Sequence, residues 1–434
     1  MLSMDQQPGL VVRRPVGEHV TAKGVTQSCG EHHLRLAALV SRVIDATKRT
    51  IAVPLAGVIA LVPDAWGMHW MGRHDTLTRL ARHFPTVWVN PARGWREAWL
   101  PSHTAAALHS EPGPDTPNFL VYEASRWLPR IHRPSTAARF LERRRLLRAR
   151  RLLRDRGCKQ IVLYLWRPEF APALDLLLHD VSCYAIEDEY TFSAVGLPID
   201  PLEAALIARV DQVFISSKAM FERKGSINRH TLCVPNGVDY AAYTAPTEEP
   251  SDLRGIPHPR IGYIGWIKEQ LDLPLVLTLA RRHPAWSFVL VGPTRASGED
   301  AIILEALRQL PNVDVLGVKP HMVLPAYFQH VDVTIMPYRL TGYTEYIDPM
   351  KLPQGLATGR PVVSAPIRAA KGFPDVVAIA ATPDEWSAAI ESALAPSAMS
   401  PSRISARRAV AKAHDWDGLV ERIAHEISAR LASS

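Results

Sequence analysis

The sequence YIDPMKLPQGLATGRPVVS, residues 346–364, decides the fold. It predicts a loop, a short helix and a buried strand in succession. Pro349 fits the first helical turn, where no backbone N–H is needed, so we expect the helix to begin at 348–349. Gly359 is expected in the left-handed conformation that ends a helix, and Pro361 prevents its continuation. Val362 and Val363 then begin a β-branched strand, which makes the stretch one unit of an α/β protein.

The same stretch is a candidate anion site. Lys351 is placed in the first turn of the predicted helix, with Gln354 three residues further on the same face. The free N–H groups of a helix start, the helix dipole and an ammonium group all favour phosphate. On local chemistry alone, an ordinary βα unit with a solvated lysine is the alternative.

The pattern D-P-x-K-x-x-(E/Q)-x-x-A-x-G-x-P-V-V in this stretch resembles the donor-site signature of GT-B glycosyltransferases, close to glycosyltransferase family 4 and the teichuronic-acid and exopolysaccharide enzymes. The resemblance implies that Asp348 and Lys351 belong to the donor site and that Lys351 meets the donor diphosphate. In the family a Glu usually holds the ribose hydroxyls at the position of Gln354. Some members, such as the xanthan glucuronosyltransferase, have Gln there as this chain does. Two features depart from the pattern: Glu345 is one position off the first Glu of the family, and Pro353 removes a hydrogen bond from the predicted helix.

Sequence before the signature supplies further donor-site candidates. Gly262 and Gly265 straddle the end of a predicted strand at 260–264, and glycine lets backbone approach a phosphate closely. By the resemblance, this loop and the basic Lys268 face the diphosphate. The loop at 338–344 would line the nucleotide or sugar pocket, which adds Tyr338 and Arg339.

The first half of the chain alternates strands and helices from Gly57 onward. A loop at 64–74 follows the first strand, and ligands of open α/β sheets sit at such carboxyl ends. Its acceptor-side candidates are Trp66, Arg73 and His74, of which Arg73 partly matches a family segment. A single histidine in such a loop is more often structural than catalytic.

Three carboxylates, Glu187, Asp188 and Glu189, follow the strand predicted at 182–186. Their mutual repulsion can raise a pKa, as a general base requires. The resemblance places the base role on Asp188. Solvated loop acids or helix caps are the alternative. The turn P-N-G-V-D at 235–239 is typical of the domain junction in the family.

Nine arginines lie among the eighteen residues 139–156, interleaved with pairs of apolar residues. A helix here would carry one apolar stripe flanked by arginines, which fits an anionic membrane surface. The residues expected to contact the membrane are Arg143, Arg144, Arg148 and Arg151. A solvated face of a sheet-packed helix, a nucleic-acid patch and an interdomain helix are the alternatives.

Length, composition and net charge limit the class of protein. With 434 residues, 47% of them hydrophobic and 21% charged, the composition is that of a globular protein of two or three domains. The four cysteines have neither metal-site nor disulfide spacing. No apolar run reaches the ~20 residues of a transmembrane helix, and the first 30 residues lack the apolar core of a signal peptide. The net charge is +7, and its positive excess lies in the first half of the chain.

Together these features predict an α/β protein with the GT-B fold, in which two Rossmann-like doubly wound domains face one another across a cleft. The expected parts are an N-terminal extension (1–50), an acceptor-side domain (51–240), a linker (241–259), a donor domain (260–415) and a final helix (416–434) returning to the first domain. The resemblance implies a glycosyltransferase, without metal or other cofactor, that moves a sugar from a nucleotide-diphosphate sugar to a lipid-linked or saccharide acceptor in surface polysaccharide or glycolipid synthesis. It would act in the cytoplasm, in peripheral contact with the inner face of the plasma membrane. A GT-B sugar-nucleotide epimerase and a non-catalytic partner protein remain alternatives, and the pI of about 9.3 keeps a nucleic-acid binder open.

Overall fold

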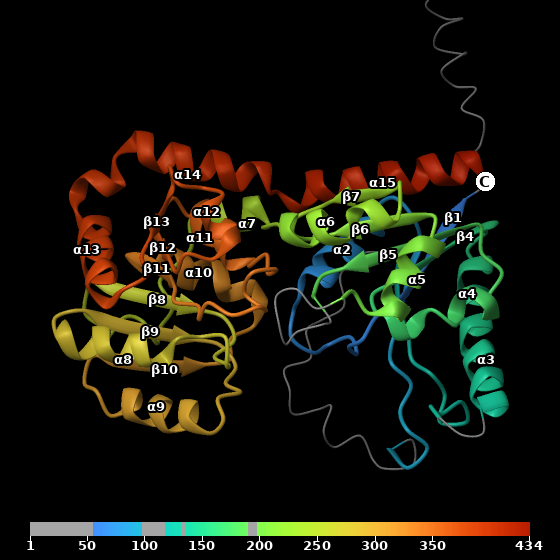
Figure 1. Ribbon diagram of the computed structural model, residues 1–434, viewed down its shortest axis with the longest axis horizontal. Helices are drawn as coiled ribbons and strands as arrows, with labels where there is room; N and C mark the ends of the chain where they lie inside the picture. The colour runs from blue at the N-terminus through green and yellow to red at the C-terminus, as the bar shows by residue number, and fades with distance from the viewer. Residues whose placement is uncertain (1–54, 98–117, 132–134, 190–197) are drawn as a thin grey trace, which may run out of the picture. The chain divides into compact units, whose positions relative to one another are not determined.

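The computed structural model describes residues 55–97, 118–131, 135–189 and 198–434. The N-terminal extension expected at 1–50 lies outside the described residues. Two parallel sheets organise the described chain (Figure 1). We call each sheet with its covering helices a lobe, the N-terminal lobe and the C-terminal lobe.

A seven-stranded sheet forms the N-terminal lobe, in the order β3-β2-β1-β4-β5-β6-β7. All of its neighbouring strands pair in parallel. Because helices cover both faces of a parallel sheet, its inner strands are largely apolar, and β1 is buried at every position. The strands are β1 (Ala56–Leu61), β2 (Thr86–Val89), β3 (Phe119–Tyr122), β4 (Gln160–Leu165), β5 (Val181–Ile186), β6 (Gln212–Ile215) and β7 (Thr231–Cys233).

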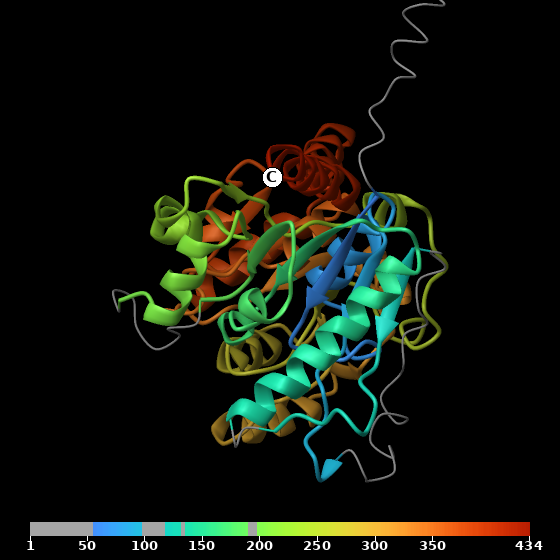
Figure 2. The same cartoon turned by 90° about the vertical axis from the view of Figure 1, so that its right-hand side faces the viewer.

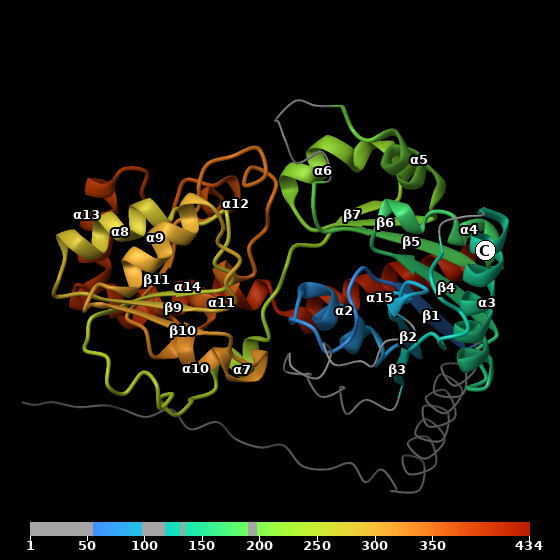
Figure 3. The ribbon, with the colours of Figure 1, turned by 90° about the horizontal axis from the view of Figure 1, so that it is seen from below.

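Helices cover both faces of this sheet. One apolar cluster joins the sheet to α2 and α15, and contact between these two helices is visible in Figure 3. A second cluster joins the opposite face to α3, α4, α5 and α6. The helices are α2 (Gly72–Leu80), α3 (Ser135–Arg154), α4 (Ala173–Leu176), α5 (Pro201–Arg209), α6 (Lys218–Lys224) and α15 (Trp416–Ser433).

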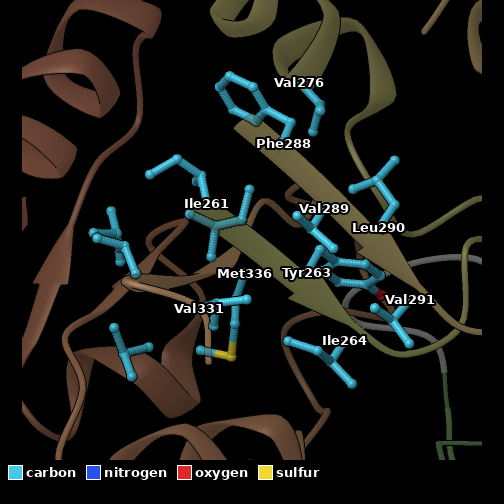
Figure 4. Packing of buried hydrophobic residues seen from close by; sticks show 14 of the residues in the cluster. Ile261, Tyr263, Ile264, Val276, Phe288, Val289, Leu290, Val291, Val331 and Met336 are labelled. Carbon is cyan, nitrogen blue, oxygen red and sulfur yellow. The ribbon is translucent and has the colours of Figure 1, made fainter. Parts of the chain in front are cut away.

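A six-stranded parallel sheet forms the C-terminal lobe, in the order β10-β9-β8-β11-β12-β13. Figure 4 shows its apolar core, where Ile261 and Tyr263 of β8 pack beside Phe288 and Val289 of β9. The strands are β8 (Arg260–Ile264), β9 (Ser287–Val291), β10 (Val313–Gly317), β11 (Val333–Met336), β12 (Val362–Ser364) and β13 (Val377–Ile379). The helices are α7 (Tyr240–Thr244), α8 (Leu273–Arg282), α9 (Glu299–Arg308), α10 (Leu324–Gln329), α11 (Lys351–Ala357), α12 (Arg368–Lys371), α13 (Pro383–Leu394) and α14 (Pro401–Ala413). The predicted α/β fold with two doubly wound sheets is confirmed.

The chain passes between the lobes twice, and the two passages are bonded to each other. The amide of Val238 donates to the carbonyl of His414 at 2.9 Å, and the amide of Trp416 donates back to Val238 at 3.0 Å. A Cβ on Gly237 would lie 2.7 Å from the carbonyl oxygen of His414, so the passages require glycine at this position. The stretch 241–259 was expected to be a linker, but it packs into the C-terminal lobe. It begins with α7 and gives three buried side chains to the core of the C-terminal lobe: Tyr243, Leu253 and Ile256.

The signature helix α11 begins two residues later than predicted, at Lys351. Pro353 is therefore its third residue. N–H groups in the first turn have no intrahelical acceptor, so this proline removes no helical hydrogen bond. Gly359 has φ of 80°, the left-handed conformation predicted for the residue that follows the helix.

Candidate functional site

A cavity of about 670 Å³ lies at the carboxyl ends of strands from both sheets. Gly265 follows β8, Gly292 follows β9 and Val318 follows β10, whereas Glu187 follows β5 and the segment 67–72 follows β1. Loops in this position carry the ligand site of open α/β sheets. The cavity is therefore the candidate active site.

Two glycines allow Lys351 to cross the floor of the cavity. A Cβ on Gly265 would lie 1.8 Å from Cε of Lys351, and a Cβ on Gly292 would lie 2.1 Å from the carbonyl oxygen of Gly265. Both glycines have positive φ, 152° and 139°. Larger residues would therefore displace the lysine or separate the two loops.

Aromatic rings surround the ammonium group of Lys351. Its Nζ lies 5.4 Å from the ring centre of Tyr263 and 5.9 Å from that of Tyr338, and 3.4 Å from the hydroxyl of Tyr338. Ring faces attract a cation without neutralising it. The positive charge is thus held in place at the cavity.

A second ammonium group lies in the same cavity. Nζ of Lys268 is 5.7 Å from the ring centre of Tyr343. Burial lowers the pKa of Lys268, and Lys351 lowers it further. The two ammonium groups are close enough to repel one another, and an anion bound near both would offset that repulsion.

The helix start contributes less to this seat than the sequence predicted. The amide of Leu352 already donates to Pro349, and the amide of Gln354 donates to Met350. With seven residues, α11 has only a small dipole. Lys351 and Lys268 therefore supply most of the positive charge, since the other cations of the lining, Arg79 and Lys319, are paired with aspartates.

Asp348 lines the cavity and is bonded to the junction between the lobes. Its carboxylate accepts the backbone N–H of Asn236 at 2.6 Å, and the side-chain amide of Asn236 donates to the carbonyl of Asp348 at 2.7 Å. Burial raises the pKa of Asp348 to about 7, and the Asn236 bond opposes the rise. Asp348 therefore fastens the loop before α11 to Asn236.

The remaining donor-side candidates separate into two groups. Tyr338 and Gln354 line the cavity, as do Gly265 and Lys268. Arg339 does not, because its guanidinium pairs with Asp300 at 2.5 and 2.9 Å and donates to the carbonyl of Glu269. In the structure Arg339 ties two loops of the C-terminal lobe together, and its donor-site role stays a prediction. Glu345 pairs with Arg368, away from the cavity lining.

The acidic segment after β5 places its three carboxylates in different surroundings. Glu187 accepts from Arg73 at 2.8 Å and from the indole of Trp166 at 3.0 Å. Glu189 pairs with the buried Lys224 at 3.1 Å. Asp188, between them, lines the cavity, and the hydroxyl of Tyr343 lies 3.4 Å from its carboxylate. Burial raises the pKa of Glu187, and Arg73 opposes the rise.

The three acceptor-side candidates do not line the cavity, and this assignment is corrected. Trp66 packs against Trp88 and Phe119. Arg73 is only 6% exposed and joins Asp64 to Glu187. The ring of His74 accepts the N–H of Met71 at 3.0 Å, and burial lowers its pKa to about 3. All three therefore hold the loop rather than face a substrate.

Neighbouring residues of the same loop line the cavity instead. The ring of Trp70 stacks on His321 with centroids 3.7 Å apart, and His69 meets the ring of Trp266 edge-on at 4.5 Å. The glycines, tryptophans and histidines of 64–74 predicted a site wall, which the structure shows. The loop sequence could not show which of its side chains line the cavity, because their partners are distant in sequence. Trp266 and His321 are both about 200 residues or more from the loop.

The arginine-rich segment forms α3, which runs along the first sheet (Figure 2). Leu146, Ala149 and Leu153 are buried against the sheet, so the apolar stripe expected to face a membrane is part of the core. The four arginines expected at the membrane are exposed: Arg143, Arg144, Arg148 and Arg151. None of the described helices is both long and apolar enough to cross a membrane.

Comparisons with known proteins agree with this architecture. Residues 258–395 match the sequence model of the family described as Glycosyl transferases group 1. A relative, TuaH of Bacillus subtilis (strain 168), is named as a teichuronic acid biosynthesis glycosyltransferase, and it is 30% identical over 235 residues. These residues cover 52% of this chain and 58% of TuaH, so the match spans less than two thirds of that relative.

Solved structures extend the likeness to most of the chain. HepE of Anabaena, in complex with UDP, superposes with a TM-score of 0.61 at 15% identity, covering 86% of this chain and all of HepE. A glycosyltransferase of Rickettsia africae gives 0.59 at 10% identity, covering 87% of this chain and 98% of that one. The chain has the GT-B fold, and the resemblance to GT-B glycosyltransferases stated from its sequence is confirmed. Its C-terminal lobe carries the group 1 glycosyl transferase match.

Proposed function

We propose that the protein is a glycosyltransferase that moves a sugar from a nucleoside-diphosphate sugar to a lipid-linked or saccharide acceptor. One observation carries the proposal. The ammonium group of Lys351 lies over Gly265 in a cavity that Lys268 shares, inside the segment that matches the group 1 family. HepE, which shares the fold, was solved with UDP.

The chemistry follows from where charge develops. When the bond between the sugar C1 and the diphosphate oxygen breaks, negative charge grows on the diphosphate. Lys351 and Lys268 would stabilise that charge in a site already arranged to receive it. We propose that these two groups replace a metal ion and that no cofactor takes part.

The acceptor hydroxyl forms the new bond to C1 and loses a proton. If the reaction inverts the configuration at C1, Asp188 is the proposed base, since it reaches the cavity between two anchored neighbours. If the reaction retains configuration, the departing diphosphate takes the proton and Asp188 holds the acceptor hydroxyl.

The acceptor and the place of action belong to the same proposal. TuaH is named for teichuronic acid biosynthesis, which supports a surface polysaccharide or glycolipid as the product. We propose that the enzyme works in the cytoplasm, bound peripherally to the anionic inner face of the plasma membrane through the exposed arginines of α3.

A screen of nucleotide sugars tests the proposal. UDP-, GDP-, ADP- and dTDP-sugars would be added to the purified full chain, and thermal shift and release of the nucleoside diphosphate would be measured. At least one donor should stabilise the parent protein and be hydrolysed slowly by it. That donor should neither stabilise the Lys351→Ala variant nor be hydrolysed by it. Isomerised nucleotide sugar without acceptor would show an epimerase instead. Absence of binding by every donor would show a non-catalytic protein.

A further inference from the structure

Two tryptophans outside the cavity are exposed in the loops that follow β2 and β3. Trp95 is 58% exposed and Trp127 is 65% exposed. An arginine lies over each ring: Arg96 at 5.2 Å from the centre of Trp95, and Arg126 at 5.4 Å from the centre of Trp127. Exposed aromatic side chains that gather on adjoining loops can mark an interaction surface.

Hydrogen bonds join these two loops to each other and to α3. The amide of Arg130 donates to the carbonyl of Arg93 at 2.7 Å, and Gly94 forms a bridge with Arg130. Arg145 of α3 donates to the carbonyls of Leu128 and Pro129 at 3.1 and 2.9 Å. The two loops and the helix thus lie against one another.

The outer side of α3 repeats the pattern of the loops. Phe140 is 55% exposed, and the guanidinium of Arg144 lies 5.1 Å from its ring centre. We call the combined surface the tryptophan–arginine face. It comprises Trp95, Trp127, Phe140, Arg93, Arg96, Arg126, Arg130, Arg143, Arg144, Arg148 and Arg151.

The charge of this surface is strongly one-sided. The described stretches 93–97, 118–131 and 135–156 contain 13 arginines and four acidic residues. Two of the acids are already engaged, since Glu97 accepts the N–H of Gly94 and Glu123 accepts from Asn90. A small cavity of about 180 Å³ between Arg93 and Arg126 opens on the same loops. A partner for this face therefore carries many negative charges.

Aromatic rings with arginines beside them fit the boundary of a lipid bilayer. Tryptophan prefers the head-group region, where its ring is in apolar surroundings and its N–H is near water. Arginine lays its apolar stem along the same boundary while its charge meets phosphate. A single-stranded nucleic acid would also attract the arginines and stack its bases on aromatic rings. A guanidinium already lies over each of these three rings, however, which favours the bilayer.

We infer that the tryptophan–arginine face binds the surface of an anionic bilayer, with Trp95 and Trp127 inserted at head-group depth. This inference deepens the proposed membrane contact and replaces the apolar stripe of α3, which is buried, by the two loop tryptophans. It does not depend on which sugar the cavity transfers. Failure of the donor screen would leave it standing.

Flotation of the full chain with phosphatidylglycerol–phosphatidylcholine vesicles tests the charges. Binding should be strong to these vesicles, weak to pure phosphatidylcholine, and lost at 1 M salt, where charges are screened beyond ~3 Å. Replacing Arg143, Arg144 and Arg148 by Gln should lower the partition coefficient at least tenfold, since each arginine near the surface contributes about fivefold. The control carries Gln at three exposed arginines elsewhere, Arg254, Arg281 and Arg403, and should bind like the parent.

Lipids brominated near the head group test the tryptophans. They should quench part of the fluorescence of the parent protein, and that part should disappear in the Trp95→Phe/Trp127→Phe variant, which still floats. The Trp95→Ser/Trp127→Ser variant should float several-fold less than a control with Ile302→Ser, which alters a 72% exposed apolar residue. Circular dichroism would check folding of each variant.

Two outcomes would overturn the inference. One is equal binding to neutral and anionic vesicles by the parent and the Arg143, Arg144 and Arg148 variant. The other is loss of binding to a nucleic acid or acidic polysaccharide in that variant while its vesicle binding stays unchanged.

Discussion

Asn236 and Asp348 hold each other by two hydrogen bonds, although they are 112 residues apart. The backbone N–H of Asn236 donates to the carboxylate of Asp348, and the side-chain amide of Asn236 donates to its backbone carbonyl. Asn236 belongs to the first passage between the lobes, and Asp348 lies three residues before Lys351. The pair therefore fastens the loop before Lys351 to the segment in which the chain first passes between the lobes.

The raised pKa of Asp348 predicts a pH effect on stability. Its pKa is about 7 in the folded protein and ordinarily 3.8. Between these values the unfolded chain binds fewer protons at this site, so the contribution of Asp348 to stability falls as pH rises from about 4 to about 7. In Asp348→Asn that part of the decline should vanish, which unfolding curves at pH 4 to 8 would show. Parallel curves for the parent and the variant would refute the assignment.

Arg73 is predicted to be a structural residue of the loop after β1. Arg73→Met should lower the free energy of unfolding by about 2 kcal/mol, less than the ~3–5 kcal/mol for a fully buried pair, because its partners Asp64 and Glu187 reach solvent. Arg82→Met, which removes an exposed pair with Asp417, should cost about 0.5 kcal/mol. Urea unfolding of both variants measures the difference. Equal losses would contradict the structural role.

Gly265 is predicted to be required for the position of Lys351. In Gly265→Ala the new methyl group would occupy the place of the lysine's Cε, and a φ of 152° would strain the backbone. Affinity for UDP, ADP or GDP, whichever the parent binds, should fall at least tenfold in calorimetry. Gly255→Ala is the matched control, since a Cβ there meets no atom within 4 Å. A Gly265→Ala variant with parental affinity would show that Lys351 is not held by this loop.

The sequence predicted those helix ends and strands that depend only on neighbouring residues. Gly359 ends α11 with a positive φ, and valines after it form β12, because each depends on neighbouring residues alone. Lys268 and Lys351 meet in one cavity because both follow carboxyl ends of parallel strands, a rule of the fold.

Pairings distant in sequence could not be predicted in this way. Arg339 was a donor-site candidate from its place in the loop, but its partner Asp300 is 39 residues away. Arg73 donates to Glu187, and the ring of His74 packs against Trp88, so both side chains are buried. Tyr263 was interpreted only as a strand residue, although its ring faces the ammonium group of Lys351. No local pattern distinguishes such side chains from their neighbours.

The affinity of the Lys351→Ala variant for the donor diphosphate tests the central claim most directly. Hydrogen bonds to a charged group contribute about 1.5–3 kcal/mol, so affinity for the nucleoside diphosphate that the parent binds should fall about 10- to 100-fold. Release of that diphosphate from the donor should fall with it. Lys371→Ala, an exposed lysine outside the cavity, should behave like the parent. Parental affinity and turnover in a folded Lys351→Ala protein would contradict the account.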